Sequence, residues 1–335
     1  MKTLLIALLF ALPLAAQESD PRIAEGVALH DAGKYDEAIA RYKAVLADDP
    51  ANVTATYEMA FSYQMKNDFA QCRTLLEPLA EKAGRLQVAI LTTLGNCLDS
   101  SGDAKAAIAT YRNALQLAPE DPGALYNLAV ALGGDKQYDE ARATFEKELA
   151  LRPKHANSRI FLASIFQAQN FRAPAILEYL RFLALEPATP RSATAAVRVL
   201  DLLDLGVSKT GRKTINIAVD PDARKEEGDF SAFEMMMGLL AGAKLGEKQK
   251  GSEFDAVRGQ LASALAMLTE SPQQRGSSYT ETQNVPFFSK LVETKMLDTF
   301  AGRALAPANL KGTDVWLKKN AAALQELDAF LKTAP

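Results

Sequence analysis

A pattern of small, large apolar and proline residues recurs along the N-terminal part of this chain, with a period of about 34 residues. The small position is occupied, at almost constant spacing, by Ala38, Cys72, Ala107, Ala141 and Ala175. Four residues after each stands a large apolar side chain, in order Tyr42, Leu76, Tyr111, Phe145 and Tyr179. This period predicts stacked helix pairs, because each unit can bury its apolar side only against its neighbours.

The pattern defines five repeats, each with two apolar helical runs. They span residues 19–52, 53–86, 88–121, 122–155 and 156–189, and four of them close with a proline (Pro50, Pro119, Pro153 and Pro187). The second repeat lacks this proline and instead carries Pro78 within its second helical run. Because a proline ring cannot continue the helical hydrogen bonds, we expect that helix to kink or to end early.

The repeats resemble tetratricopeptide repeats. The third matches best, through Leu91, Leu94, Gly95, Leu98, Gly102, Ala107, Tyr111, Ala114 and Pro119. The resemblance covers about half of the chain and implies an all-α fold, a right-handed α-solenoid of about five helix pairs. Thr189 and Pro190 then open one more helix, to residue 205, which we interpret as a cap on the exposed core. The predicted array with its capping helix therefore spans residues 19–205.

The C-terminal third departs from the repeat pattern. Residues 206–228 contain scattered glycine, proline and charged residues, and predict a linker with room for one short extended segment. Four helical runs follow, separated by a polar stretch at 271–284 that we expect to be mobile. Residues 229–335 therefore predict a small helical domain, similar to C-terminal regions of some exported bacterial repeat proteins, a resemblance to which no activity attaches.

The first sixteen residues have the pattern of a signal peptide. Lys2 precedes an apolar run from Leu4 to Leu14, and Ala15–Ala16 offers a small-residue cleavage site. The alternatives are an uncleaved membrane anchor and a buried N-terminal helix. We expect cleavage near Ala16 and an exported protein, periplasmic or secreted. No other stretch is long and apolar enough to span a bilayer, so the mature form is expected to have no stable membrane span.

Composition and motifs argue against several functions. The net charge of −3 has the wrong sign for a protein that binds nucleic acid by neutralising phosphates. His30 and His155 have no partners at metal-ligand spacing, so we predict no metal site and no cofactor. The sequence contains no nucleophile elbow, phosphate-binding glycine loop or dinucleotide motif. We therefore predict no catalytic residues and no enzymatic activity.

Only two cysteines are present, Cys72 and Cys97. An exported compartment permits a disulfide between them, and helices of neighbouring repeats touch. Two buried thiols that pack as small apolar side chains are the alternative. Spacing alone does not decide between these states, because the geometry of the two side chains does.

The resemblance implies where a partner would bind. In tetratricopeptide arrays, the first helix of each repeat lines a concave surface that commonly holds a peptide. The corresponding positions here predict a groove of aromatic and neutral residues: Tyr57, Phe61, Met65, Thr92, Asn96, Tyr126, Val130, Phe161 and Gln167. The alternative is that some of them pack against the next repeat. Lysine and arginine are absent from these positions, which disfavours acidic tails as partners.

These observations predict a non-enzymatic, exported interaction scaffold that binds a protein or peptide on its concave face. Two other functions stay open. The chain can be a structural subunit of a cell-envelope assembly that uses its convex face or its C-terminal domain. It can also be a glycan-binding or glycan-hydrolysing module in which the repeats are a spacer.

Overall fold

The computed structural model describes residues 20–81, 84–210, 214–218, 226–246, 251–270 and 277–334. The chain forms two compact bodies, an N-terminal body of residues 1–119 and a C-terminal body of residues 120–335. The predicted signal peptide and its cleavage site lie outside the described residues.

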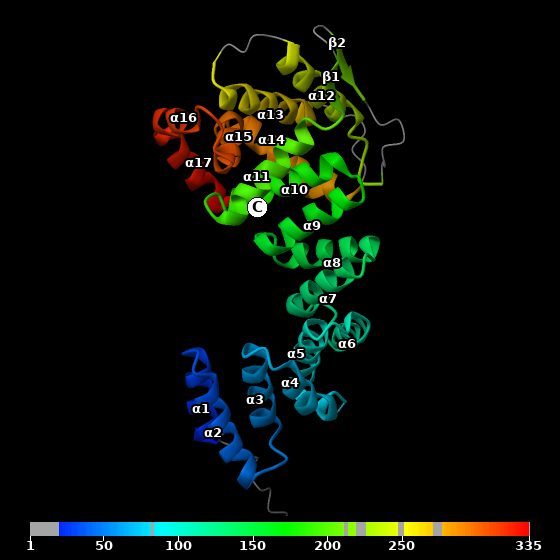
Figure 1. Ribbon diagram of the computed structural model, residues 1–335, viewed down its shortest axis with the longest axis vertical. Coiled ribbons are helices and arrows are strands. Elements are labelled where there is room, and N and C mark those ends of the chain that lie inside the picture. The colour runs from blue at the N-terminus through cyan, green and yellow to red at the C-terminus, as the bar shows by residue number, and fades with distance from the viewer. Residues whose placement is uncertain are drawn as a thin grey trace, which may run out of the picture. The chain divides into compact units, whose positions relative to one another are not determined.

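The N-terminal body contains three helix pairs (Figure 1). We call the first helix of each pair the A helix and the second the B helix. The pairs are α1 (Pro21–Asp31) with α2 (Tyr35–Asp48), α3 (Val53–Met65) with α4 (Phe69–Leu76), and α5 (Gln87–Ser100) with α6 (Ala104–Leu117). Two short 3₁₀ turns, η1 (Glu77–Leu79) and η2 (Gly84–Leu86), join the second pair to the third.

Local sequence signals set the ends of these helices. The side chains of Asn52, Asp68 and Asp103 cap α3, α4 and α6 by accepting backbone N–H groups that the first helical turn leaves unpaired. Helix α4 ends at Leu76, two residues before Pro78, and continues only as the turn η1. The early end predicted from Pro78 is therefore confirmed.

The small residue of the repeat lies where the A and B helices cross. Ala38, Cys72, Ala107, Ala141 and Ala175 are all fully buried. A second close approach occurs sixteen residues before the large residue, where a Cβ atom added to Gly26 or Gly95 would lie 2.4 Å from the ring of Tyr42 or Tyr111. These tyrosine rings lie directly on the backbone of the A helix, and a methyl group there would push the helices apart.

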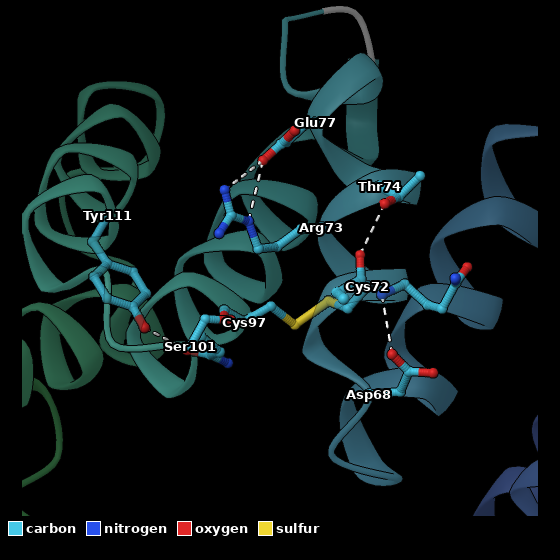
Figure 2. Close-up of a disulfide and its surroundings, with 11 residues drawn as sticks. Asp68, Cys72, Arg73, Thr74, Glu77, Cys97, Ser101 and Tyr111 are labelled. Carbon is cyan, nitrogen blue, oxygen red and sulfur yellow. Dashed lines mark hydrogen bonds and ion pairs between the residues drawn. A yellow bond between two sulfur atoms is a disulfide. The ribbon is translucent and has the colours of Figure 1, made fainter.

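A disulfide joins the second and third repeats. Cys72 on α4 and Cys97 on α5 are bonded, with their Cα atoms 6.4 Å apart (Figure 2). Both side chains are fully buried, and the bridge closes a loop with a sequence separation of 25. Restriction of the unfolded chain by a loop of this length stabilises the fold by roughly 3 kcal/mol. Of the two states considered for these cysteines, the structure has the bonded one.

The C-terminal body begins with two more helix pairs and the predicted capping helix. The pairs are α7 (Pro122–Gly134) with α8 (Tyr138–Leu151) and α9 (Ala156–Ala168) with α10 (Arg172–Leu185), followed by α11 (Pro190–Leu203). Thr189 and Ser192 form a reciprocal capping box at the start of α11, as a helix that begins at Pro190 requires. Helix α11 ends two residues before the predicted position.

Part of the predicted linker folds as a hairpin. Strands β1 (Val207–Thr210) and β2 (Thr214–Ile217) pair antiparallel, with Val207 opposite Ile217. The sequence predicted one extended segment, and the structure has two. Ile215 and Ile217 reach α12, where Gly238 and Gly242 leave room for them. This contact joins the hairpin to the C-terminal helices.

The remaining helices are α12 (Ser231–Gly246), α13 (Glu253–Glu270), α14 (Val285–Glu293), α15 (Leu297–Leu305), α16 (Thr313–Lys319) and α17 (Ala321–Thr333). A π-helical turn, η3 (Thr280–Asn284), precedes α14, and a 3₁₀ turn, η4 (Ala306–Ala308), follows α15. The sequence predicted four helices here. The last two are each divided, at Thr294–Met296 and at Asn320.

Helix α10 is the centre of the C-terminal body. Every residue from Ala173 to Leu183 is buried, because α9 and α11 cover one side of the helix and α12, η3 and α15 contact the other. The C-terminal helices therefore pack against the last B helix of the array.

We expect Gly95→Ala to lower the free energy of unfolding by about 1–2 kcal/mol, because the new methyl group collides with the Tyr111 ring. Gly134→Ala is the matched control, since no atom lies within 4 Å of its added Cβ. That control should be neutral or stabilising by up to about 1 kcal/mol, from better helix propensity. Urea denaturation of both variants measures this, and equal effects would contradict the packing argument.

Candidate functional site

An aromatic row lies on the A helices of the N-terminal body. Tyr57 and Phe61, one turn apart on α3, have parallel rings with centroids 6.3 Å apart. The His30 ring stacks on Phe61 at 4.7 Å, and its Nδ1 lies 2.8 Å from the Ser62 hydroxyl. Both predicted aromatic residues are therefore half-buried in a packed row. Met65 on the next turn is exposed.

The two predicted polar residues on α5 make contacts within the N-terminal body. The Thr92 hydroxyl donates to the Val88 carbonyl at 2.8 Å. The Asn96 side-chain oxygen accepts a 2.7 Å hydrogen bond from the Tyr111 hydroxyl. Asn96 therefore helps to position the tyrosine ring that packs on Gly95, a structural role that sequence reasoning did not assign to it.

An apolar pocket opens between α7 and α9 in the C-terminal body. Its volume is about 360 Å³, within the usual range for a site that holds a small molecule or a large side chain. Phe161 is 41% exposed at its edge and stacks at 6.2 Å on the buried Phe145. We call it the α7–α9 pocket, lined by Ala129, Val130, Gly133, Gly134, Tyr138, Phe145, Phe161, Ser164, Ile165 and Ala168.

The structure brings three predicted residues together at this pocket. Val130 and Phe161 line it, and the Tyr126 ring meets Phe161 edge-on at 6.3 Å. Gln167 lies further along α9, where its side-chain oxygen accepts a 3.0 Å hydrogen bond from the Tyr179 hydroxyl. Sequence reasoning missed Phe145 and Ile165 in the pocket, because both belong to positions that the repeat pattern assigns to the core.

A histidine beside this pocket has acid and hydroxyl neighbours, but they do not form a proton relay. His155 Nδ1 lies 3.0 Å from a Glu148 carboxylate oxygen and 2.8 Å from the Ser158 hydroxyl. A relay needs the two groups on opposite ring nitrogens. Ser158 is also fully buried. Burial lowers the pKa of His155, a shift that Glu148 partly opposes.

A buried charged cluster attaches η3 to the last repeat. Arg159 on α9 donates to the Glu178 carboxylate on α10 at 2.9 Å, and Asn284 donates to its other oxygen at 2.7 Å. All three side chains are buried, so each charge needs these partners to offset its lost hydration. The polar stretch predicted to be mobile is thus ordered over its described residues, 277–284.

A second acidic group lies in the same interface. Glu227 is buried, pairs with Arg142 of α8, and accepts a 2.9 Å hydrogen bond from the Thr280 hydroxyl. Glu146 on α8 has a buried carboxylate oxygen without a hydrogen-bond partner among the described residues. Burial, with the nearby charge of Glu227, raises the pKa of Glu146 to about 7.

One signal for this cluster was visible in the sequence. Arg159 occupies the repeat position that Leu91 and Leu125 hold in the two preceding repeats. A charged residue at an apolar position of the repeat indicates that a polar or charged partner lies beside it in the fold. The partners themselves come largely from segments far along the chain, so the sequence did not identify them.

Two features are absent from the described ranges. No group of three or more histidine, cysteine, aspartate or glutamate side chains there could hold a metal ion. Within the same ranges, no helix combines the length and apolarity needed to cross a bilayer.

Comparison with known proteins agrees with the repeats. The tetratricopeptide repeat family model matches residues 29–93 and 100–165. The matched region is therefore similar to tetratricopeptide repeats, and proteins built from such repeats are typically non-enzymatic scaffolds for protein interactions. No curated protein matches the chain.

Several solved structures are similar to about half of this chain. Pseudomonas aeruginosa pilF is similar at 20% identity, over 55% of this chain and 84% of that chain, with a TM-score of 0.50. YrrB, described as a tetratricopeptide repeat protein with an unusual peptide-binding site, has 21% identity over 54% of this chain and 91% of its own, with a TM-score of 0.45. MamA from Desulfovibrio magneticus has 17% identity over 50% of this chain and 93% of its own, with a TM-score of 0.46.

The raised pKa of Glu146 predicts a pH dependence of stability. The folded protein holds this proton more tightly than the unfolded chain, whose pKa is near 4.5. Its stabilisation is therefore full below about pH 4.5 and is lost as the pH rises through about 7. The groups that face it are Glu227, Arg142 and Glu178. Between pH 5 and 8 the free energy of unfolding of the unmodified protein should fall by on the order of 1–2 kcal/mol through this group, and Glu146→Gln should abolish that fall.

Thermal unfolding of the two proteins across this pH range measures the effect. Glu326→Gln, which changes an exposed acid on α17, is the matched control and should follow the unmodified chain. Identical pH profiles for the unmodified chain and Glu146→Gln would show that Glu146 does not titrate in this way.

Proposed function

We propose that this protein is a non-enzymatic interaction scaffold that binds a protein or peptide segment on the A-helix face of its repeats. The α7–α9 pocket carries the proposal. It combines an exposed aromatic ring with an apolar floor, the arrangement that anchors a partner's side chain at low entropic cost. The aromatic row of Tyr57 and Phe61 offers a further contact surface in the N-terminal body.

The packing of the C-terminal helices supports this choice of face. They cover the B helix α10, so the convex side of the fifth repeat is occupied within the chain. Helices α7 and α9 have the α7–α9 pocket on their other side. The same packing weakens the glycan-hydrolase alternative. The cavity where Phe287 and Leu331 meet α10 holds only about 20 Å³ and has no carboxylate in its lining.

A second candidate function rests on exposed apolar residues of α12. Met235 and Leu239 lie one turn apart and are 48% and 49% exposed. Such a pair suits a subunit of a larger assembly that docks through its C-terminal helices. This is the envelope-subunit alternative, and it uses a different surface from the α7–α9 pocket.

We expect Phe161→Ala to weaken partner binding about tenfold or more, because it removes the exposed aromatic anchor. The fold should be little affected, since much of the ring already faces solvent. The measurement is quantitative capture of partners from envelope extract by the mature protein. Val315→Ala, which truncates an exposed apolar residue on α16, is the matched control.

The paired variant Met235→Ser with Leu239→Ser tests the second candidate in the same assay. Loss of partners by this pair, with Phe161→Ala unchanged, would favour the assembly subunit and overturn the A-helix face. Melting curves for each variant separate a lost contact from a lost fold.

We also propose that the protein is exported and cleaved near Ala16. The apolar run Leu4–Leu14 supports export, and the Cys72–Cys97 bridge suits an oxidising compartment. The intact mass of protein isolated from its native cells should match a chain that begins at or near Gln17 and lacks the two thiol hydrogens. A mass that includes residues 1–16 and two free thiols would refute this.

A further inference from the structure

Helix α11 extends the A-helix face of the C-terminal body. Arg191 of α11 donates a 2.6 Å hydrogen bond to Asn157 of α9, and the two residues are one repeat period apart. Helix α11 therefore lies beside α9 in the same register as one A helix beside the next. Val130, Ser164 and Arg198, also one period apart from each other, occupy equivalent positions on α7, α9 and α11.

This row changes from apolar to cationic. Val130 and Ser164 line the α7–α9 pocket. The Ser164 hydroxyl lies 3.3 Å from the Tyr179 hydroxyl. Burial raises the pKa of Tyr179, and the Arg198 charge is close enough to oppose that rise. Ser164 thus links the pocket to the Tyr179 hydroxyl, and Arg198 stands one repeat period beyond Ser164 on α11.

Arg198 differs from the other arginine of α11. Arg191 is held by Asn157 and by an ion pair with Glu186. Arg198 is exposed and makes no hydrogen bond or ion pair with any of the residues that the structure describes. Asp201, exposed one turn further along α11, repels additional negative charge. The end of the row therefore has room for one carboxylate rather than for an acidic run.

We propose that this face binds an extended peptide segment through a large apolar side chain in the α7–α9 pocket and one acidic side chain on Arg198. The proposal rests on the proposed scaffold function and specifies its ligand. Neighbouring helices pack about 8–10 Å apart, and an extended chain advances about 3.3 Å per residue. The pocket lies between α7 and α9, about one and a half such spacings or roughly 12–15 Å from α11, so the apolar and acidic residues of the partner are about four positions apart.

The test is selection of a random dodecapeptide display library, with capped ends, on the full mature chain. Peptides enriched by the unmodified protein should share a large apolar residue with Asp or Glu about four positions away. Arg198→Gln should keep the apolar preference and lose the acidic one. Gly134→Leu should lose the apolar preference, because the new side chain enters the pocket at a position with no atom nearby. Lys147→Gln, an exposed charge on α8, is the matched control.

A synthetic peptide from this selection then gives the coupling between the two charges. Changing its acidic residue to the amide should weaken binding to the unmodified protein about threefold to tenfold, and should not affect binding to Arg198→Gln. Equal weakening in both proteins would overturn the assignment of Arg198. A melting curve for each variant shows whether it still folds.

The outcomes separate the two levels of the proposal. If the unmodified chain enriches no peptide, the proposed scaffold function on this face is wrong. Enrichment of apolar peptides without acidic preference would keep that function and reject the role of Arg198. Concentration-dependent dimers that Gly134→Leu abolishes would show that a second copy of the chain occupies the pocket, which also overturns the proposal.

Discussion

The close crossing of A and B helices is the constraint on which the repeats depend. The small residues from Ala38 to Ala175 are fully buried, and the large residue four positions later fills the space toward the A helix. Where that residue is Tyr42 or Tyr111, the A helix has glycine sixteen positions earlier. Ala129 and Ala163 occupy this place opposite Phe145 and Tyr179. In these four repeats a glycine or an alanine therefore lies opposite the ring that covers the A helix.

The last two repeats carry charged residues at buried positions of the repeat. Their charged departures, Arg159, Glu178 and Glu148, are buried and paired rather than solvated. Replacing an apolar residue by a buried charge costs hydration, which only well-placed partners offset. The segment around Asn284 supplies one partner for Glu178. The C-terminal helices are therefore joined to the array by specific polar contacts as well as by apolar packing.

The array was predictable from its period, because every repeat packs its two helices through residues at the same positions. Local signals such as Pro78 and Thr189 act on neighbouring residues alone, and the helix end and helix start that they predicted are present. The contacts of Arg142 with Glu227 and of Arg159 with Glu178 depend on the tertiary fold, which composition and spacing do not encode. The candidate groove was predicted only as a set of positions. Which of them open into a pocket depends on neighbours such as Ile165 and on the glycines that end α7.

The α7–α9 pocket is a consequence of where the chain places its packing residues. Gly133 and Gly134 end α7 without side chains, so the only α7 ring on Phe161 among the described residues is Tyr126, which meets it edge-on, and Phe161 stays 41% exposed. Helix α10 meanwhile gains neighbours on its far side from α12, η3 and α15. Packing is completed on the B-helix side and left incomplete on the A-helix side. An exposed apolar site that the fold could have filled with one larger residue at Gly134 favours an external occupant over a defect of packing.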